Sequence, residues 1–332
     1  MKLSELGEFG LIRRLKKSLQ KISPQVLEGI GDDAAALRPS KKKLLITTDM
    51  LLEGIHFDLR FYTLFQLGYK TLAVNISDII AMGGTPKYFL LGLGIPNGYT
   101  SQALDELFSG IKTLAEKHKI EIIGGDTCAS NHGLILSGTL LGETNTVIKR
   151  SGAKVGNGIF VTGTLGDSAM GLMLLKRLKR PVKIQNENLN FKIHHSQLNF
   201  YTALPLFKKH LMPEPRFLKR IKDITAMIDI SDGLLIDLCH ICEESNVGAK
   251  IYLNKIPISK ELLSTSKLMK INPIELALKG GEDYELLFTA PAGSKVNGTL
   301  IGEITRKGRV MVDESGKETS FRPEGYEHFK QR

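Results

Sequence analysis

The sequence contains no tryptophan and only three cysteines among its 332 residues. A low, odd cysteine count excludes a disulfide framework and is typical of a protein kept in a reducing compartment. No run of 18 apolar residues occurs, so the sequence predicts no transmembrane helix. Residues 1–5 also lack the charged-then-apolar form of a signal peptide. We therefore expect a cytoplasmic protein with no membrane partner.

Lys and Arg outnumber Asp and Glu by 45 to 35, which gives a formal charge of +10. A basic chain can bind nucleic acid, but this one has no basic stretch interleaved with aromatic residues. Its basic runs, 41–43 and 176–183, are typical of solvated turns and helix ends. We therefore expect no nucleic-acid partner, and an anionic small substrate suits the same charge.

Common catalytic patterns are missing as well. The chain has neither a Walker A pattern nor a kinase glycine loop with a downstream His-Arg-Asp. Cys239 and Cys242 form a single CxxC without a second pair, which favours helical core contacts over a metal site. His194 and His195 lack further ligands at zinc-site spacing, and we interpret the surrounding polar segment, 181–199, as an exposed excursion.

The length suggests about two domains, and apolar periodicity predicts both helices and strands. A polar, glycine-containing turn at 149–153 marks the expected boundary between residues 1–150 and residues 151–332. The alternation of elements predicts a mixed α/β or α+β protein. The pattern predicts helices over 3–19, 64–82, 102–118 and 169–178, and strands over 44–48, 89–95, 120–123, 134–141 and 158–162.

Several acidic residues stand beside glycines or at the ends of apolar runs. We expect Asp49 to close the strand that begins at Leu44, and Asp126 to close the strand over 120–123. A strand that ends in a carboxylate delivers it to one rim of a sheet. Any one such residue is explained as a turn former or helix cap, but their number indicates a cluster. The acids concerned are Asp33, Asp49, Asp126, Asp229 and Glu282.

Asp78 lies inside the predicted apolar helix, three residues after Asn75 on the same face. A charge in a buried helix is costly unless it is paired or bound to a cation. Few His or Cys residues accompany these acids, which argues against zinc, whereas oxygen ligands suit hard cations such as Mg²⁺. Because Mg²⁺ is typically held by carboxylates together with substrate phosphates, the pattern indicates phosphoryl chemistry.

The sequence does not decide which residues contact the phosphates. Residues 163–168 open a helix, and their backbone N–H groups are one candidate anion cradle. Arg150, at the domain boundary, is another candidate contact. A plain strand–turn–helix connection capped by Ser168 explains the same segment equally well.

The order of these motifs resembles that of the thiamine-monophosphate kinases, a family of the aminoimidazole ribonucleotide synthetase superfamily. The resemblance extends over about residues 7–329 and rests on 7–9, 29–33, 47–57, 72–78, 124–127, 166–169, 229–234 and 280–286. It implies an N-terminal α/β domain whose sheet pairs with that of a second subunit to form a barrel, and a C-terminal α+β domain that completes the active site. It also implies a homodimer that transfers the γ-phosphoryl group of ATP directly to thiamine monophosphate, using several Mg²⁺ ions, to form thiamine diphosphate in the last step of its biosynthesis.

The resemblance also implies roles for individual residues. The magnesium ligands would be Asp33, Thr47, Thr48, Asp49, Asp78, Asp126, Asp229 and Asp232. The nucleotide would be contacted by His118, Gly125, Asp126, Arg150 and Ser231. The thiamine substrate would be contacted by His56, Glu282 and Tyr326, the last within the short match 325–329. No protein nucleophile is required, because metal ions offset the repulsion between two phosphates.

Alternatives remain at this stage. Without the resemblance, His56 would be interpreted as a hydrogen-bonded strand histidine. Another ATP-using enzyme of the same superfamily, such as a cyclo-ligase or a selenophosphate synthetase, is the nearest alternative. A selenophosphate synthetase would carry a reactive Cys or selenocysteine in a glycine-rich N-terminal segment, and none is present. A non-catalytic hydrogenase-maturation relative would end in a cysteine-bearing tail, and this chain ends Phe329-Lys330-Gln331-Arg332. A nucleic-acid-binding protein would show strongly salt-dependent binding.

Overall fold

The computed structural model describes residues 14–18, 23–28, 35–182, 184, 190–193 and 196–328. These residues belong to two compact units, Met1–Val147 with Lys179–Pro181, and Ile148–Leu178 with Val182–Arg332. The predictions for motif 7–9, for Asp33 and for the His194–His195 pair lie outside the described residues. In the part of the chain that is described, no helix is long and apolar enough to cross a membrane.

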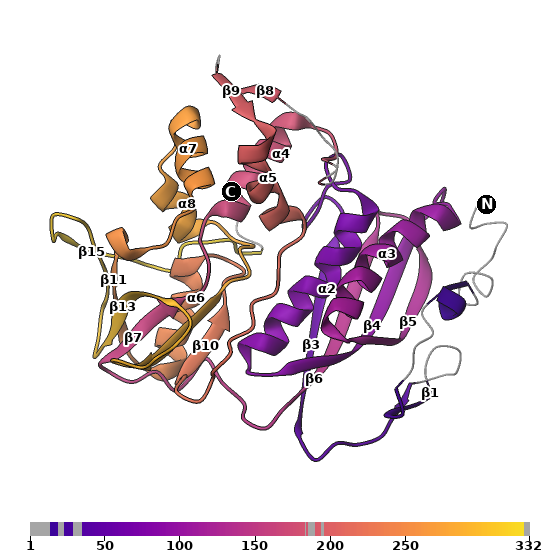
Figure 1. Cartoon of the computed structure of the whole chain (residues 1–332), viewed down its shortest axis with the longest axis horizontal. Coiled ribbons are helices and arrows are strands. Elements are labelled where there is room, and N and C mark those ends of the chain that lie inside the picture. The colour runs from indigo at the N-terminus through magenta and orange to yellow at the C-terminus, as the bar shows by residue number, and fades with distance from the viewer. Residues whose placement is uncertain are drawn as a thin grey trace. The chain divides into compact units, whose positions relative to one another are not determined.

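The first unit is built on a four-stranded mixed sheet in the order β3-β6-β4-β5 (Figure 1). Strands β4 and β5 are parallel, and the other neighbours are antiparallel. Residues 14–18, part of the helix predicted over 3–19, are helical. The strands of this unit are β1 (Val26–Glu28), β2 (Ala36–Leu37), β3 (Lys43–Leu52), β4 (Thr85–Pro96), β5 (Glu121–Ser130) and β6 (Ile135–Thr144).

Two helices, α2 (Leu64–Ala81) and α3 (Ser101–His118), pack together beside this sheet (Figure 1). The predictions of helices over 64–82 and 102–118 are confirmed. Each begins at a threonine cap: Thr63 accepts from the backbone N–H of Gln66 and Thr100 from that of Ala103.

Glycines permit the close approach of α2 and α3. A Cβ atom at Gly68 would lie 1.9 Å from the carbonyl oxygen of Leu107, and one at Gly110 would lie 1.9 Å from that of Phe65. No side chain fits at such distances, so the two helix backbones touch at these positions.

Strand β3 has one buried and one open face. Leu45 and Leu51 are buried, whereas Leu44, Ile46 and Met50 are 55%, 65% and 53% exposed. Because side chains alternate across a strand, the exposed apolar residues share one face of the sheet. We call Leu44, Ile46 and Met50 the open face of β3.

The second unit contains a seven-stranded sheet in the order β10-β12-β7-β13-β11-β14-β15. All neighbouring strands in it are antiparallel except β11 and β14. The strands of this unit are β7 (Asn157–Val161), β8 (Asn190–Ile193), β9 (Ser196–Asn199), β10 (Ala226–Asp229), β11 (Gly248–Tyr252), β12 (Leu286–Pro291), β13 (Thr299–Thr305), β14 (Arg309–Val312) and β15 (Glu318–Ser320).

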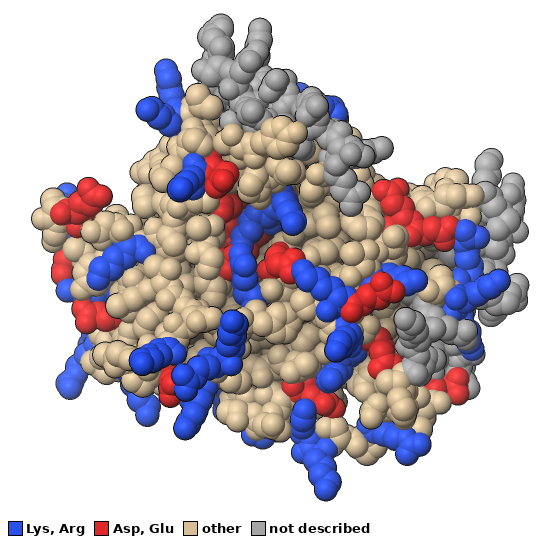
Figure 2. Space-filling model, in the orientation of Figure 1, with Lys and Arg blue, Asp and Glu red and all other residues tan. Residues whose placement is uncertain are grey.

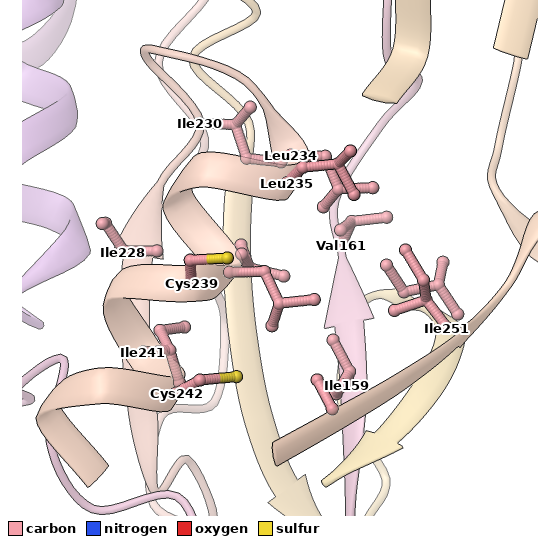
Figure 3. Packing of buried hydrophobic residues seen from close by; sticks show 14 of the residues in the cluster. Ile159, Val161, Ile228, Ile230, Leu234, Leu235, Cys239, Ile241, Cys242 and Ile251 are labelled. Carbon is pink, nitrogen blue, oxygen red and sulfur yellow. The ribbon is translucent and has the colours of Figure 1, made fainter. Parts of the chain in front are cut away.

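The helices of this unit are α4 (Asp167–Leu178), α5 (Phe200–Leu211), α6 (Leu234–Ser245), η1 (Leu253–Lys255), α7 (Lys260–Met269) and α8 (Pro273–Lys279). Helix α6 packs into the aliphatic core of this unit, where Cys239 and Cys242 lie among Ile, Leu and Val side chains (Figure 3). Both thiols are buried. The interpretation of this CxxC as a set of core contacts is confirmed.

Two strands are longer than predicted. Asp49 lies inside β3 and Asp126 inside β5, so the prediction that each closes its strand is wrong. The reason in β3 is that Met50, Leu51 and Leu52 extend the pairing with β6 beyond the aspartate. In β5 the glycines before Asp126 stay paired with β4.

Candidate functional site

Two of the residues implied as magnesium ligands in the first unit are joined by a hydrogen bond between β3 and α2. Thr47 and Asp49 alternate with the open face of β3 and share the side of Leu45 and Leu51. The hydroxyl of Thr47 donates to Oδ2 of Asp78 at 2.5 Å. This bond stabilises a carboxylate within an otherwise apolar helix, and it leaves the lone pairs of the Thr47 oxygen available to a cation.

The structure separates the two adjacent threonines. Thr48 lies on the opposite side of β3 from Thr47. Its hydroxyl donates to the carbonyl oxygen of Gly138 at 3.0 Å and lies 3.1 Å from the hydroxyl of Thr139. Thr48 is therefore bound to the neighbouring strand β6 rather than to α2.

Asn75, one turn before Asp78 on α2, is fully buried. Its Nδ2 donates to the carbonyl oxygen of Thr71 at 3.0 Å, which fixes the orientation of the amide. Among the described residues, its Oδ1 has no hydrogen-bond partner. Leaving such an acceptor unsatisfied costs about 1–3 kcal/mol, and the atom adds a further oxygen donor to this part of α2.

Asp126 and Gly125 lie on β5, at the far edge of the sheet from β3. Two strands intervene, which corresponds to about 14 Å between the β3 and β5 backbones. Gly125 has φ +155°, and a Cβ there would lie 2.0 Å from the carbonyl oxygen of Leu91. Only glycine fits this position.

The donors of this unit suit Mg²⁺ in kind, since they are hydroxyl and carboxylate oxygens. Among the described residues, no group of three or more His, Cys, Asp or Glu side chains is placed to hold a metal ion. Ligand distances of about 2.1 Å also prevent one ion from binding Asp49 and Asp126 of the same sheet. The residues therefore fit separate ions more readily than a single one.

His56, His118 and Arg150 occupy three different settings. His56 lies in a turn after β3, not in a strand, and its Nδ1 accepts the backbone N–H of Leu52 at 3.1 Å, so a neutral ring carries its proton on Nε2. His118 is the last residue of α3. Arg150 is exposed before β7, and its carbonyl oxygen accepts from the hydroxyl of Ser245 at 3.2 Å.

In the second unit, backbone hydrogen bonds bring several candidate residues together. The N–H of Glu282 donates to the carbonyl oxygen of Ser231 at 2.7 Å, and the N–H of Tyr326 donates to that of Asp232 at 2.9 Å. Asp229, buried at the end of β10, starts the same loop. Segments 229–232, 282–285 and 326 therefore form one assembly.

Asp237, in the first turn of α6, is a residue that the sequence analysis missed. Its Oδ2 accepts from the backbone N–H groups of Asp232 at 3.2 Å and Gly233 at 3.1 Å. Burial raises its pKa well above the usual value, and the charges of Asp229 and Asp232 raise that pKa further. The signal was an acid in the first turn of a helix that follows Gly233.

The pKa of Asp232 is also raised, first because of its burial. The neighbouring basic residues His240, His328 and Arg150 act in the opposite direction on that pKa. A cation bound at this carboxylate would favour its ionised form and so offset the desolvation that raises its pKa.

In the segment 163–168, two backbone N–H groups bind the carboxylate of Asp283 and are not open to a phosphate. The backbone N–H groups of Gly166 and Ser168 donate to the carboxylate of Asp283 at 2.6 and 3.1 Å. Burial raises the pKa of Asp283 to about 7. These N–H groups are already used, so the strand–turn–helix interpretation is the better one, with Asp283 in place of Ser168 as the cap.

A buried ion-pair group lies beside Asp283. Glu285 is fully buried and accepts from the hydroxyl of Thr162 at 2.6 Å and from Nε of Arg216 at 2.9 Å. Lys209 forms a further ion pair with it. Two cations and a hydroxyl offset the desolvation of one carboxylate and anchor the chain directly after Glu282 and Asp283.

Comparison with known proteins agrees with this layout. The AIR synthase related protein family models match residues 31–144 for the N-terminal domain and 154–313 for the C-terminal domain. A thiamine-monophosphate kinase of Aquifex aeolicus is 40% identical over 99% of this chain and 100% of its own. The chain belongs to the thiamine-monophosphate kinase family. The Escherichia coli K12 member of this family is 35% identical over 97% of this chain and 98% of its own.

Solved structures of the family are similar throughout. AaThiL complexed with AMPPCP and TMP is 38% identical, with a TM-score of 0.74 over 99% of both chains. The thiamine-monophosphate kinase of Stenotrophomonas maltophilia K279a is 34% identical, with a TM-score of 0.78 over 94% of this chain and 98% of its own. The hydrogenase maturation protein HypE, at 18% identity and a TM-score of 0.69, shares the fold alone. The family predicted from the sequence motifs is confirmed.

Proposed function

We propose that this chain transfers the γ-phosphoryl group of ATP to the phosphate of thiamine monophosphate and releases thiamine diphosphate and ADP. The observation that carries the proposal is the similarity, over 99% of both chains, to AaThiL complexed with AMPPCP and TMP. The oxygen donors Thr47 and Asp78, joined by a hydrogen bond, support phosphoryl chemistry at this fold.

The first unit supplies oxygen ligands for magnesium. We assign Mg²⁺ binding to Asp33, Thr47, Thr48, Asp49, Asp78 and Asp126, with Asp229 and Asp232 in the second unit. Bound Mg²⁺ would neutralise charge on the two phosphates that have to meet. Thr47 holds Asp78 in place, and the absence of a side chain at Gly125 lets β5 lie against the carbonyl oxygen of Leu91 on β4.

The remaining proposed roles concern binding and orientation. We assign His118, Gly125, Asp126, Arg150 and Ser231 to ATP, and His56, Glu282 and Tyr326 to thiamine monophosphate. Residues 1–150 would bind ATP and Mg²⁺ and form the dimer, and residues 151–332 would complete the active site. A neutral His56 with its proton on Nε2 is a hydrogen-bond donor to substrate. An ionised acceptor phosphate needs no general base.

The open face of β3 supports a homodimer. Exposing three large apolar side chains on one strand face to water is unfavourable. The unpaired backbone groups of an edge strand can also pair with another chain. We propose that the sheet joins that of a second copy into a barrel, with Leu44, Ile46 and Met50 in its interior. The described residues of one chain form an open sheet.

The proposal is tested by product analysis. Purified protein is incubated with ATP, millimolar Mg²⁺ and thiamine monophosphate, and the thiamine species are separated by chromatography. We expect thiamine diphosphate, and we expect none when thiamine replaces its monophosphate as the acceptor. Folded protein that forms no diphosphate would contradict the kinase assignment.

A further inference from the structure

His210, near the end of α5, is a buried histidine that none of the roles above uses. Its side chain is 2% exposed, and its Nδ1 lies 3.2 Å from Oε2 of Glu282, whose side chain is 27% exposed. The same Nδ1 lies 3.1 Å from the hydroxyl of Ser168 on α4. An ionised carboxylate can only accept, so the contact with Glu282 requires the hydrogen on Nδ1.

The position of His210 is set by helix packing. Helices α4 and α5 meet at Gly171, where a Cβ would lie 2.2 Å from the carbonyl oxygen of Leu206 and 3.3 Å from Cβ of His210. This close approach places the imidazole at the start of α4, beside Ser168. The ring therefore sits on a rigid contact between two helices.

The backbone at Glu282 is held in an uncommon conformation. Its φ is +63° and that of Tyr284 is +48°, values that non-glycine residues rarely adopt. Asp283 is anchored at α4, and Glu285 is anchored by Lys209 and Arg216. With both neighbouring acids fixed, the carboxylate of Glu282 is the partly exposed member of the group, and His210 lies within hydrogen-bond distance of it.

We propose that His210 is a positioning residue whose Nδ1–H holds the carboxylate of Glu282 in the orientation that contacts the thiamine substrate. This inference rests on the proposed function. Since the interaction orients a binding group and touches no reacting atom, its loss raises KM for thiamine monophosphate and leaves kcat and KM for ATP nearly unchanged.

The test uses a matched pair of variants in a steady-state assay. The amide nitrogen of Asn reaches the place of Nδ1, whereas that of Gln reaches the place of Nε2. We expect His210→Gln to raise KM for thiamine monophosphate about tenfold, the scale of one charge-assisted hydrogen bond, and His210→Asn to restore most of it. In a Glu282→Ala background, His210→Gln should have no further effect, whereas a merely structural role would give additive losses.

An unchanged KM for thiamine monophosphate in His210→Gln, or additive effects with Glu282→Ala, would overturn the positioning role while the kinase assignment stands. A wild-type protein that forms no thiamine diphosphate would refute the assignment itself. Should His210→Gln fail to fold, His210→Asn takes its place: it keeps a donor at the place of Nδ1, so the KM for thiamine monophosphate should stay within about threefold of the wild-type value, and a KM raised about tenfold overturns the positioning role.

Discussion

At the scale of single residues, the proposed chemistry depends on the side-chain oxygen atoms of the proposed magnesium ligands. Asp49 shares with Thr47 the side of β3 opposite its open face. The Asp49→Asn variant keeps the shape of the side chain and removes its charge. We expect turnover to fall by at least about 100-fold, with a Tm within a few degrees of the wild-type value. Steady-state kinetics and thermal melting measure the two effects.

The control for Asp49 is Glu314→Gln, which removes a charge from an exposed position on the second unit. This variant should keep both turnover and Tm. If Asp49→Asn unfolds the protein, Asp49 is a structural residue and not a metal ligand.

Asp283 gives the protein a pH-dependent stability. Its pKa is about 7 in the folded chain, from a usual value of 3.8, because burial disfavours the charge. The folded state then binds more protons than the unfolded state, so this group's contribution to the free energy of unfolding is greatest below pH 3.8 and is lost as the pH rises through 7. Asp283→Asn should flatten that decline in denaturant titrations between pH 4 and 7, and an unaltered slope would show that Asp283 titrates near its usual value.

At the scale of elements, the contact between α2 and α3 depends on Gly68 and Gly110. Gly110→Ala places a methyl group against the carbonyl oxygen of Phe65 and should lower the free energy of unfolding by about 1–3 kcal/mol. Chemical denaturation measures the change. The control, Ser109→Ala, alters an exposed position of the same helix and should cost little. Equal stability of Gly110→Ala and wild type would mean that the helices pack less closely than described.

Periodicity predicted α2 and α3 and the strands of the four-stranded sheet, but the position of Asp49 and Asp126 within their strands could not be predicted. Local sequence shows that Met50 to Leu52 are apolar, yet only pairing with β6 makes them a continuation of β3. The starts of α2 and α3 were easier to predict, because Thr63 and Thr100 are N-caps whose hydrogen bonds are local in the sequence.

The candidate site shows the same division between local and tertiary information. Motif order identified Asp78, Ser231 and Glu282 as candidates. Asp237 and His210 were missed, because their roles depend on contacts with Asp232 and Glu282 that tertiary packing creates. A histidine on an apolar helix gives no sign in the sequence of the carboxylate that it will meet.

At the scale of the whole molecule, the open face of β3 predicts self-association. Wild-type protein should elute with twice the 36.7 kDa mass of the chain in size-exclusion chromatography with light scattering. Ile46→Glu places a charge on the face and should give a monomer. Val155→Glu, at an apolar position of the second unit with 58% exposure, is the matched control and should stay dimeric. A monomeric wild-type protein would contradict the dimer.

The net charge of +10 also has a meaning at this scale. On the face shown in Figure 2, Lys and Arg side chains are scattered, with acidic groups among them. This distribution is typical of a solvated surface and does not form one continuous basic patch on that face.

The central claim is direct transfer of the γ-phosphoryl group between two phosphates. It is tested most directly by incubating the protein with Mg²⁺, thiamine monophosphate and ATP labelled in its γ-phosphoryl group, and by locating the label in the products. The account predicts the label in the terminal phosphate of thiamine diphosphate, in an amount equal to the ADP formed. Label recovered only as inorganic phosphate, with thiamine monophosphate unconsumed, would contradict it.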